Sequence, residues 1–169
     1  MKLFKNIKKW LENQEHLFYL FLLILIVPNI ILCFTEPMPV VAKVCNVLLP
    51  FAFYYLLMTL SRNCGKMFWI LFLFIFFGAF QIVLLYLFGQ SIIAVDMFLN
   101  LVTTNSSEAM ELLDNLVPAL VSVIILYIPA LILAAISIIK KRKLSSEFIR
   151  RERKKAWIAL LIGFISLGA

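Results

Sequence analysis

The sequence predicts an all-α integral membrane protein, and three observations carry this prediction. Hydrophobic residues make up 64% of the 169 residues and the mean hydropathy is +1.03, whereas a soluble domain has an apolar share of roughly 45–50%. Apolar segments close to the roughly 20 residues that cross a bilayer recur along the chain. Basic residues gather in alternate connections between them. We therefore expect a bundle of five transmembrane helices, with amphipathic helices at the outer interface between the third and fourth.

Five apolar segments are the candidate spans. They cover residues 17–34, 40–60, 67–88, 116–139 and 156–169. Pro28 is expected to kink the first span, and membrane helices tolerate such prolines because neighbours or water satisfy the freed carbonyls. The first segment also follows a basic stretch, as a secretory signal does. Its 18 residues exceed a signal's apolar run of roughly 7–15, and no small-residue cleavage site follows, so it is interpreted as a retained helix.

The fifth apolar segment has 14 residues where the sequence stops at Ala169. That is shorter than the roughly 20 residues that cross the hydrocarbon core. Residues 1–169 are therefore expected to be the membrane domain of a longer protein. The further domain would follow residue 169.

The distribution of basic residues predicts the orientation. Of the 16 lysines and arginines, 15 lie before the first span, between the second and third, or in residues 140–155 between the fourth and fifth. Because basic loops stay in the cytoplasm, the N-terminus is expected to be cytoplasmic and the fifth span to lead outward. Residues 140–155 are expected to form a basic loop attracted to anionic lipid. The net charge of +7 is thereby explained without nucleic acid.

Cysteine and histidine residues suggest no metal site in this chain. Cys33 and Cys45 fall near the outer ends of the first two spans. Whether they pair stays open, because spacing does not place two Cα atoms within disulfide reach. His16 is the only histidine, and zinc needs three or four ligands. The sequence also contains no Gly-rich phosphate loop and no GxSxG nucleophile motif.

A polar segment over residues 90–115 interrupts this apolar sequence. It contains no lysine or arginine, and its acidic residues and regularly spaced polar residues are Asp96, Asn100, Thr104, Glu108, Glu111 and Asp114. Its first part mixes apolar and polar residues as an amphipathic interfacial helix does. A second helix is expected to start near Asn105 and to continue into the fourth span. Residues four apart share a helical face, so Asp96, Asn100 and Thr104 form one ridge, which Glu108 extends if the chain continues or turns back.

Two interpretations of this ridge remain open. In the first, Asn105 caps the second helix and Glu108, three residues later, completes a capping box, while Asn100 and Thr104 are solvated. In the second, Asn100, Thr104 and Glu108 bind a zwitterionic lipid head group. The carboxylate would pair with the amine, and the amide and hydroxyl would bond to phosphate or ester oxygens. The two interpretations are compatible with each other.

The stretch VDMFLNLVTTNSSEAMELL, which follows three spans and precedes a proline-containing fourth, resembles the lipid A phosphoethanolamine transferases. In that family a membrane domain of five helices precedes a periplasmic domain of the alkaline-phosphatase type. The family pattern of Asn, Thr four residues later and Glu four residues later, followed by Ala, matches Asn100, Thr104, Glu108 and Ala109. The motif covers about 20 residues, and the expected topology covers the whole chain.

The resemblance implies a function. Such enzymes move phosphoethanolamine from phosphatidylethanolamine to a zinc-bound threonine, release diacylglycerol, and pass the group to a lipid A phosphate. Asn100, Thr104 and Glu108 are then candidate substrate-binding residues in a periplasmic helical loop. The nucleophile and the zinc ligands belong to the catalytic domain after the fifth span, so no catalytic or metal-binding residue is expected in this chain. The implied location is the bacterial inner membrane, and the implied phenotype is resistance to polymyxin and other cationic peptides.

Alternatives stay open. Relatives of these transferases modify core sugars or periplasmic glucans, so the motif leaves the acceptor undetermined. A function of another class is a non-catalytic membrane scaffold or assembly subunit that docks a basic partner through its acidic outer loop. A transporter is disfavoured because no charged residue lies near the middle of a candidate span.

Overall fold

The structure is a computed structural model of the whole chain, and it describes residues 6, 9–88 and 106–167. For residues 84–88 and 106–116 it describes the backbone alone. The described residues contain helices and no strand, which confirms the all-α class. The main elements are α2 (Gln14–Thr35), α3 (Val40–Met58), α4 (Cys64–Ile70), α5 (Phe72–Phe88), α7 (Ser106–Ile139) and α8 (Ser146–Leu167).

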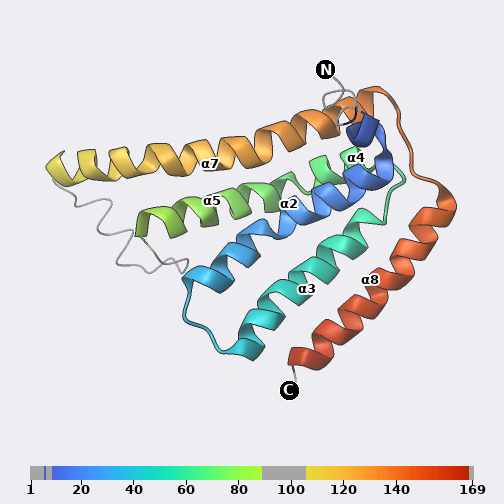
Figure 1. Cartoon of the computed structure of the whole chain (residues 1–169), viewed down its shortest axis with the longest axis horizontal. Helices are drawn as coiled ribbons and strands as arrows, with labels where there is room; N and C mark the ends of the chain where they lie inside the picture. Colours follow the sequence, from blue (N-terminus) through green and yellow to red (C-terminus); the bar gives the residue numbers. More distant parts are fainter. Residues whose placement is uncertain (1–5, 7–8, 89–105, 168–169) are drawn as a thin grey trace.

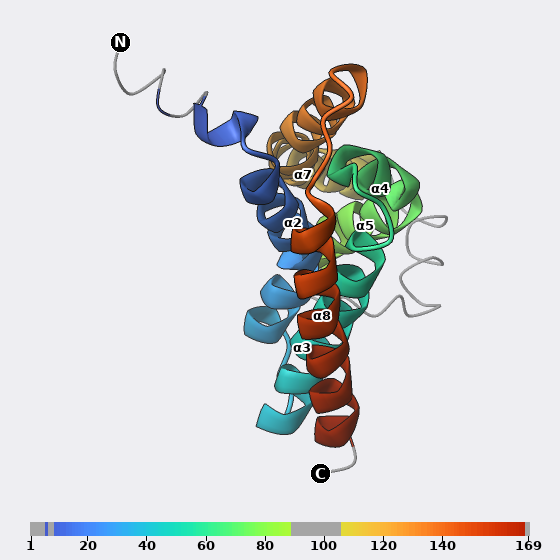
Figure 2. The ribbon, with the colours of Figure 1, turned by 90° about the vertical axis from the view of Figure 1, so that its right-hand side faces the viewer.

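Helix α2 lies at the centre of the bundle. Helices α3 and α8 run beside each other on one side of it, and α4, α5 and α7 pack together on the other (Figures 1 and 2). Aromatic side chains join the two sides: Phe21 of α2 stacks on Phe68 of α4, and Phe18 of α2 meets Phe148 of α8 edge to face. All three rings contributed by α2 and α4 are completely buried. The hydrophobic core thus forms around the N-terminal half of α2.

Several helices have the length and composition of membrane spans. Among the described residues these are α2, α3 and the Val117–Ile139 part of α7, and the pair α4 and α5 adds a fourth if it forms one bent span. Side chains that face outward from these helices are largely aliphatic and aromatic. These features are consistent with a membrane protein. The predicted spans at residues 17–34 and 40–60 correspond to α2 and α3, and α7 continues without a break from its start into the span predicted at 116–139.

The third predicted span differs from the expectation of one helix over residues 67–88. The helix starts earlier, at Cys64, because the Asn63 side chain caps it by accepting from the Lys66 N–H. It then breaks at Leu71, and α4 and α5 meet at a bend of 62°. No proline or glycine stands at the break. A close helix contact lies on each side of the bend: Gly65 of α4 packs against α7, and Gly78 of α5 packs against α2 and α7.

The secondary structure of residues 146–155 was predicted wrongly. Residues 140–155 were expected to form a loop and the span to begin at residue 156. Helix α8 instead begins at Ser146, where the hydroxyl of Ser145 accepts from the N–H of Phe148. The basic residues from Arg150 to Lys155 therefore lie on a helix that packs along α3. The described residues do not establish a fifth span.

A reciprocal amide pair joins α2 to α3. The Asn29 side chain donates to the Asn46 side chain at 3.1 Å, and Asn46 donates back to the Asn29 carbonyl at 2.9 Å. Polar pairs between membrane helices contribute about 0.6 kcal/mol on average and up to about 1.7. We expect Asn46→Leu to lower the free energy of unfolding in detergent by about 1 kcal/mol, since it leaves the Asn29 amide without this partner. Val44→Leu, at an exposed position of the same helix, serves as the control and should leave unfolding unchanged.

Candidate functional site

The predicted substrate-binding residues lie mostly outside the described residues. This is the case for Asn100 and Thr104, and for the amphipathic helix expected around Asp96. Glu108 is the third residue of α7, and its side chain is not described. The start of α7 at Ser106 agrees with the second helix predicted to begin near Asn105. The convergence of the three side chains therefore remains a prediction.

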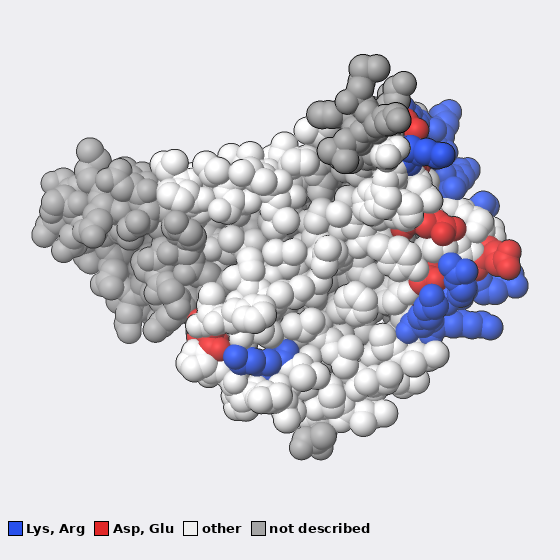
Figure 3. Space-filling view, viewed as in Figure 1, with Lys and Arg blue, Asp and Glu red and all other residues white. Residues whose placement is uncertain are grey.

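The structure describes the two helices that flank this segment. Helix α5 ends and α7 begins at the same end of the bundle (Figure 1). In the space-filling view the described lysines and arginines gather at the other end, except for one small basic patch (Figure 3). The only described basic residue outside the three stretches predicted to be cytoplasmic is Lys43. Helices α5 and α7 thus adjoin the acidic segment at the end opposite most of the described basic residues.

Hydrogen bonds assemble the basic end from parts far apart in sequence. Arg62, after α3, donates to the Leu144 carbonyl at 2.9 Å, and the Leu144 N–H donates back to the Arg62 carbonyl at 2.7 Å. The Asn63 side chain donates to the Arg142 carbonyl at 2.8 Å, and Arg142 lies 3.9 Å from the carboxylate of Glu12. These bonds hold the N-terminal region and two connections together. We call this surface the basic end.

A buried carboxylate lies within the basic end. Glu152 of α8 is completely buried and accepts a hydrogen bond from the Tyr55 hydroxyl of α3. It also accepts from Arg151 at 2.9 Å and Lys155 at 3.0 Å, whose side chains stay more than half exposed. Burial alone would raise the pKa of Glu152, but the hydrogen bonds from Tyr55, Lys155 and Arg151 outweigh it and lower this pKa to about 2. Glu152 is therefore an ionised contact between α8 and α3.

A second polar cluster joins α2, α4 and α7. The Gln14 side-chain oxygen accepts from the Ser137 hydroxyl at 2.7 Å and from the Cys64 thiol at 3.4 Å. Ser137 and Cys64 are completely buried. The Gln14 side-chain nitrogen is buried and has no hydrogen-bond partner among the described residues, so the cluster satisfies the oxygen of this amide and not its nitrogen.

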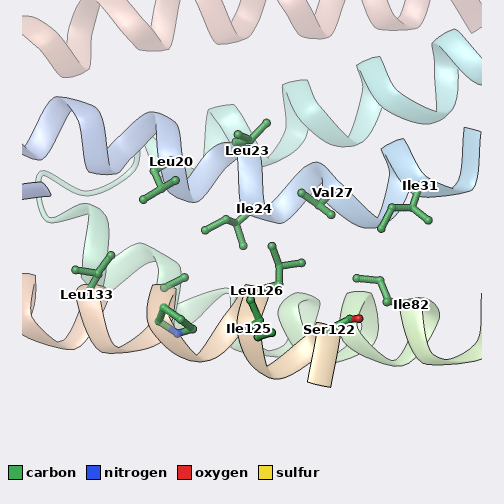
Figure 4. Close-up of a pocket in the computed structure, with 12 residues that line it drawn as sticks. Leu20, Leu23, Ile24, Val27, Ile31, Ile82, Ser122, Ile125, Leu126 and Leu133 are labelled. Carbon is green, nitrogen blue, oxygen red and sulfur yellow. The ribbon is translucent and has the colours of Figure 1, made fainter. Parts of the chain in front are cut away.

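An apolar groove separates α2 from α5 and α7. It encloses about 690 Å³ and is lined by aliphatic side chains. Figure 4 shows Ile24, Val27 and Ile31 of α2 opposite Leu126 of α7 and Ile82 of α5. The single hydroxyl in its lining, that of Ser122, donates within its own helix to the Pro118 carbonyl at 2.9 Å. The groove offers a surface for hydrocarbon and no side chain for catalysis.

The described part of the chain contains neither a group of metal ligands nor a disulfide. There, no three His, Cys, Asp or Glu side chains lie close enough to hold a metal ion. Cys33, Cys45 and Cys64 are free thiols. Cys33 donates to the Lys43 carbonyl at 3.4 Å and Cys45 to the Ser166 carbonyl at 3.3 Å, so each of these two binds a different neighbour.

Sequence reasoning missed the Glu152 cluster. Its signal was a single acidic residue within the basic run Arg150–Lys155, with Lys155 three residues later, which is the spacing of a helical ion pair. The assignment of residues 140–155 to a loop hid that spacing. The Tyr55 partner lies 97 residues away, and only the packing of α8 on α3 reveals it.

Comparisons with known proteins return no relative. No protein-family model matches the sequence, and neither a search of curated proteins nor a search of solved structures finds a match.

Proposed function

We propose that this chain is the membrane domain of an enzyme that transfers phosphoethanolamine from phosphatidylethanolamine to a lipid A phosphate. The observation that supports the proposal most is the position of the two helices that flank the motif-bearing segment, since α5 ends and α7 begins at the end of the bundle away from the basic end (Figures 1 and 3). If the basic end is cytoplasmic, the segment lies at the outer head groups. That is where a transferase of outer-membrane lipid precursors meets its donor.

In this proposal the chain anchors the enzyme in the bacterial inner membrane and binds the donor lipid. The segment over residues 90–115 forms periplasmic helices, and α8 begins the fifth span, which leads out to the catalytic domain. Asn100, Thr104 and Glu108 bind the phosphoethanolamine head group. The resemblance to the transferases assigns zinc and the threonine nucleophile to the catalytic domain. The lipid A acceptor binds to the enzyme in which the membrane domain and the catalytic domain are joined.

Glu108 tests the head-group role. We expect Glu108→Gln in the full-length enzyme to lower transfer to lipid A about tenfold, because a hydrogen bond to a charged group contributes about 1.5–3 kcal/mol and glutamine lacks the negative charge that pairs with the amine. Glutamine can still close a capping box, so α7 should keep its start at Ser106. The measurement is mass spectrometry of lipid A from cells that express equal amounts of each variant.

The matched control is Glu111→Gln, one helical turn further along α7, which should leave transfer unchanged. Glu108→Ala separates the two roles of the glutamate. If Glu108→Gln were fully active and Glu108→Ala were not, the residue would act as a helix cap and the head-group role would be wrong. If no variant of the motif affected transfer, a non-catalytic scaffold would be the better description of this domain.

A further inference from the structure

Helix α8 runs alongside α3 in the opposite direction (Figures 1 and 2). Its buried residues include Phe148, Glu152, Ala156 and Gly163, which recur at the spacing of one helical face. Two of them, Ala156 and Gly163, are small, and small residues let membrane helices approach closely. One face of α8 therefore packs on α3.

Two polar contacts join the helices at the basic end. The Glu152 carboxylate accepts from the Tyr55 hydroxyl, and the neighbouring Arg153 donates to the Thr59 carbonyl at 2.7 Å. Glu152 and Thr59 are completely buried. Apolar helix faces can slide or rotate past each other, whereas a polar contact within an apolar interface specifies one register. These contacts therefore allow one alignment of α8 on α3.

A weaker contact joins the same helices at the far end. The Cys45 thiol donates to the Ser166 carbonyl at 3.3 Å, and its sulfur lies 3.5 Å from the Ser166 hydroxyl oxygen. Between the two ends, Gly163 faces Leu49, whose methyl would lie 2.9 Å from a Cβ added to this glycine. Ser166 follows Glu152 by 14 residues, about 21 Å at a helical rise of 1.5 Å. Helix α8 is thus held at both ends.

The contacts at the two ends differ in strength. Those of Glu152 and Arg153 involve ionised side chains, and charge-assisted hydrogen bonds are about twice as strong as neutral ones. The thiol of Cys45 is a weak donor. The basic end therefore decides the register, and the contact at Ser166 follows from it.

We propose that α8 is an arm of fixed register, whose alignment on α3 is set at the basic end by Glu152 and Arg153. The consequence for activity rests on the proposed function: the catalytic domain that would follow α8 is held at one height and rotation relative to the donor-binding segment. Glu152 and Arg153 are then positioning residues, because they act through α8. A shift of one residue would move Ser166 by about 1.5 Å and rotate it by about 100°.

Disulfide formation at the far end measures the register. Ser166→Cys places a second sulfur beside Cys45, where the hydroxyl oxygen now lies 3.5 Å from the thiol. We expect these two residues to pair when the full chain is oxidised in membranes, with the bond mapped by mass spectrometry of peptides. Ile165→Cys is the matched control, since the Ile165 side chain is 74% exposed, and it should not pair.

An insertion tests which end decides the alignment. One alanine inserted between Ala156 and Trp157 leaves the contacts of the basic end in place and rotates the far end by about 100°. Ser166→Cys should then lose its disulfide, and Ile165→Cys, which takes the former place of Ser166, should gain it. Undiminished pairing of Ser166→Cys in the insertion variant would overturn the proposal, because the far end alone would then set the register.

The residues of the basic end are tested in the same assay. Glu152→Gln combined with Arg153→Gln should slow the pairing of Ser166→Cys about tenfold, because charge-assisted bonds are lost. Glu147→Gln combined with Arg150→Gln changes two exposed residues of the same helix and should leave the rate unchanged. Equal rates in the two double variants would overturn the role of Glu152 and Arg153. The insertion result does not depend on whether these variants fold.

Transfer to lipid A by the full-length enzyme tests the positioning role separately. We expect the insertion to lower transfer up to roughly a hundredfold at equal expression, since a displacement of about 1 Å can have this effect. The disulfide between Cys45 and Ser166→Cys should leave transfer unchanged. A shifted register with unaffected transfer would overturn the positioning role. A wild type without transfer would overturn the proposed function and the positioning role with it, while the disulfides would still decide the register.

Discussion

Replacing Gly65 with alanine is expected to destabilise the bundle more than the same substitution at Gly78 or Gly163. A Cβ at this position would stand 2.3 Å from the Ala134 carbonyl oxygen and 2.9 Å from the Cβ of Ser137, both on α7. Backbone atoms cannot turn aside as a side chain does, so α4 and α7 must move apart. Overpacking of this kind costs about 1–3 kcal/mol. Unfolding by heat or by SDS in detergent micelles measures the loss.

Gly163→Ala is the matched control for Gly65→Ala. Its added Cβ would meet the Leu49 side chain, with the nearest methyl at 2.9 Å. That methyl is the far end of a flexible side chain and can shift, while alanine favours the helix by up to about 1 kcal/mol over glycine. We expect little change or a small gain in stability. Equal effects of the two substitutions would show that α4 and α7 do not approach each other closely at Gly65.

Loss of the Glu152 carboxylate is expected to loosen α8 from α3. Glu152→Gln removes the charge that accepts from Tyr55, Arg151 and Lys155. Hydrogen bonds to charged groups contribute about 1.5–3 kcal/mol, and the buried Tyr55 hydroxyl would lose its charged acceptor. We expect the free energy of unfolding to fall by about 2 kcal/mol. The coupling between Glu152→Gln and Tyr55→Phe in a double-mutant cycle isolates the contact between the helices.

The same carboxylate predicts a pH dependence. Its pKa is about 2 in the folded protein and near 4.5 when unperturbed. The folded state therefore binds this proton more weakly than the unfolded state does. The stability contributed by Glu152 is complete above about pH 4.5 and is lost as the pH falls towards 2. Glu152→Gln should flatten the unfolding profile in this window, and the exposed control Glu147→Gln should not. Identical profiles for the wild type and Glu152→Gln would contradict the ionised contact.

The helical class and most helix positions could be predicted from the sequence because long apolar segments have few other ways to satisfy their backbone in a membrane. Helices α2 and α3 formed within a few residues of the expected bounds, and α7 followed its predicted course through residue 139. The start of α8 was wrong because a high density of basic residues was taken as the mark of a loop. That stretch is helical, and its Glu152 and Arg153 side chains bond to Tyr55 and Thr59, which lie 97 and 94 residues earlier in the chain.

The residues of interest for function also fall into two groups, those that the sequence predicted and those whose role depends on helix packing. Asn100, Thr104 and Glu108 were singled out by their spacing, a local property, and they stay a prediction because the structure does not describe their side chains. Glu152 was not singled out from the sequence. Its contact with Tyr55, and that of Ser166 with Cys45, depend on how α8 packs on α3, which the spacing of residues in either helix does not contain.

The sequence by itself determined the all-helical class, the apolar segments, the separation of basic from acidic connections and the motif that suggests a lipid substrate. Each of these is a property of composition or of residues within a few turns of one another. Only the tertiary structure decided the bend between α4 and α5, the burial of Glu152 beneath Tyr55 and the contact of Ser166 with Cys45. These features depend on packing between helices distant in sequence, where close packing selects one arrangement among many that the same apolar surfaces would allow.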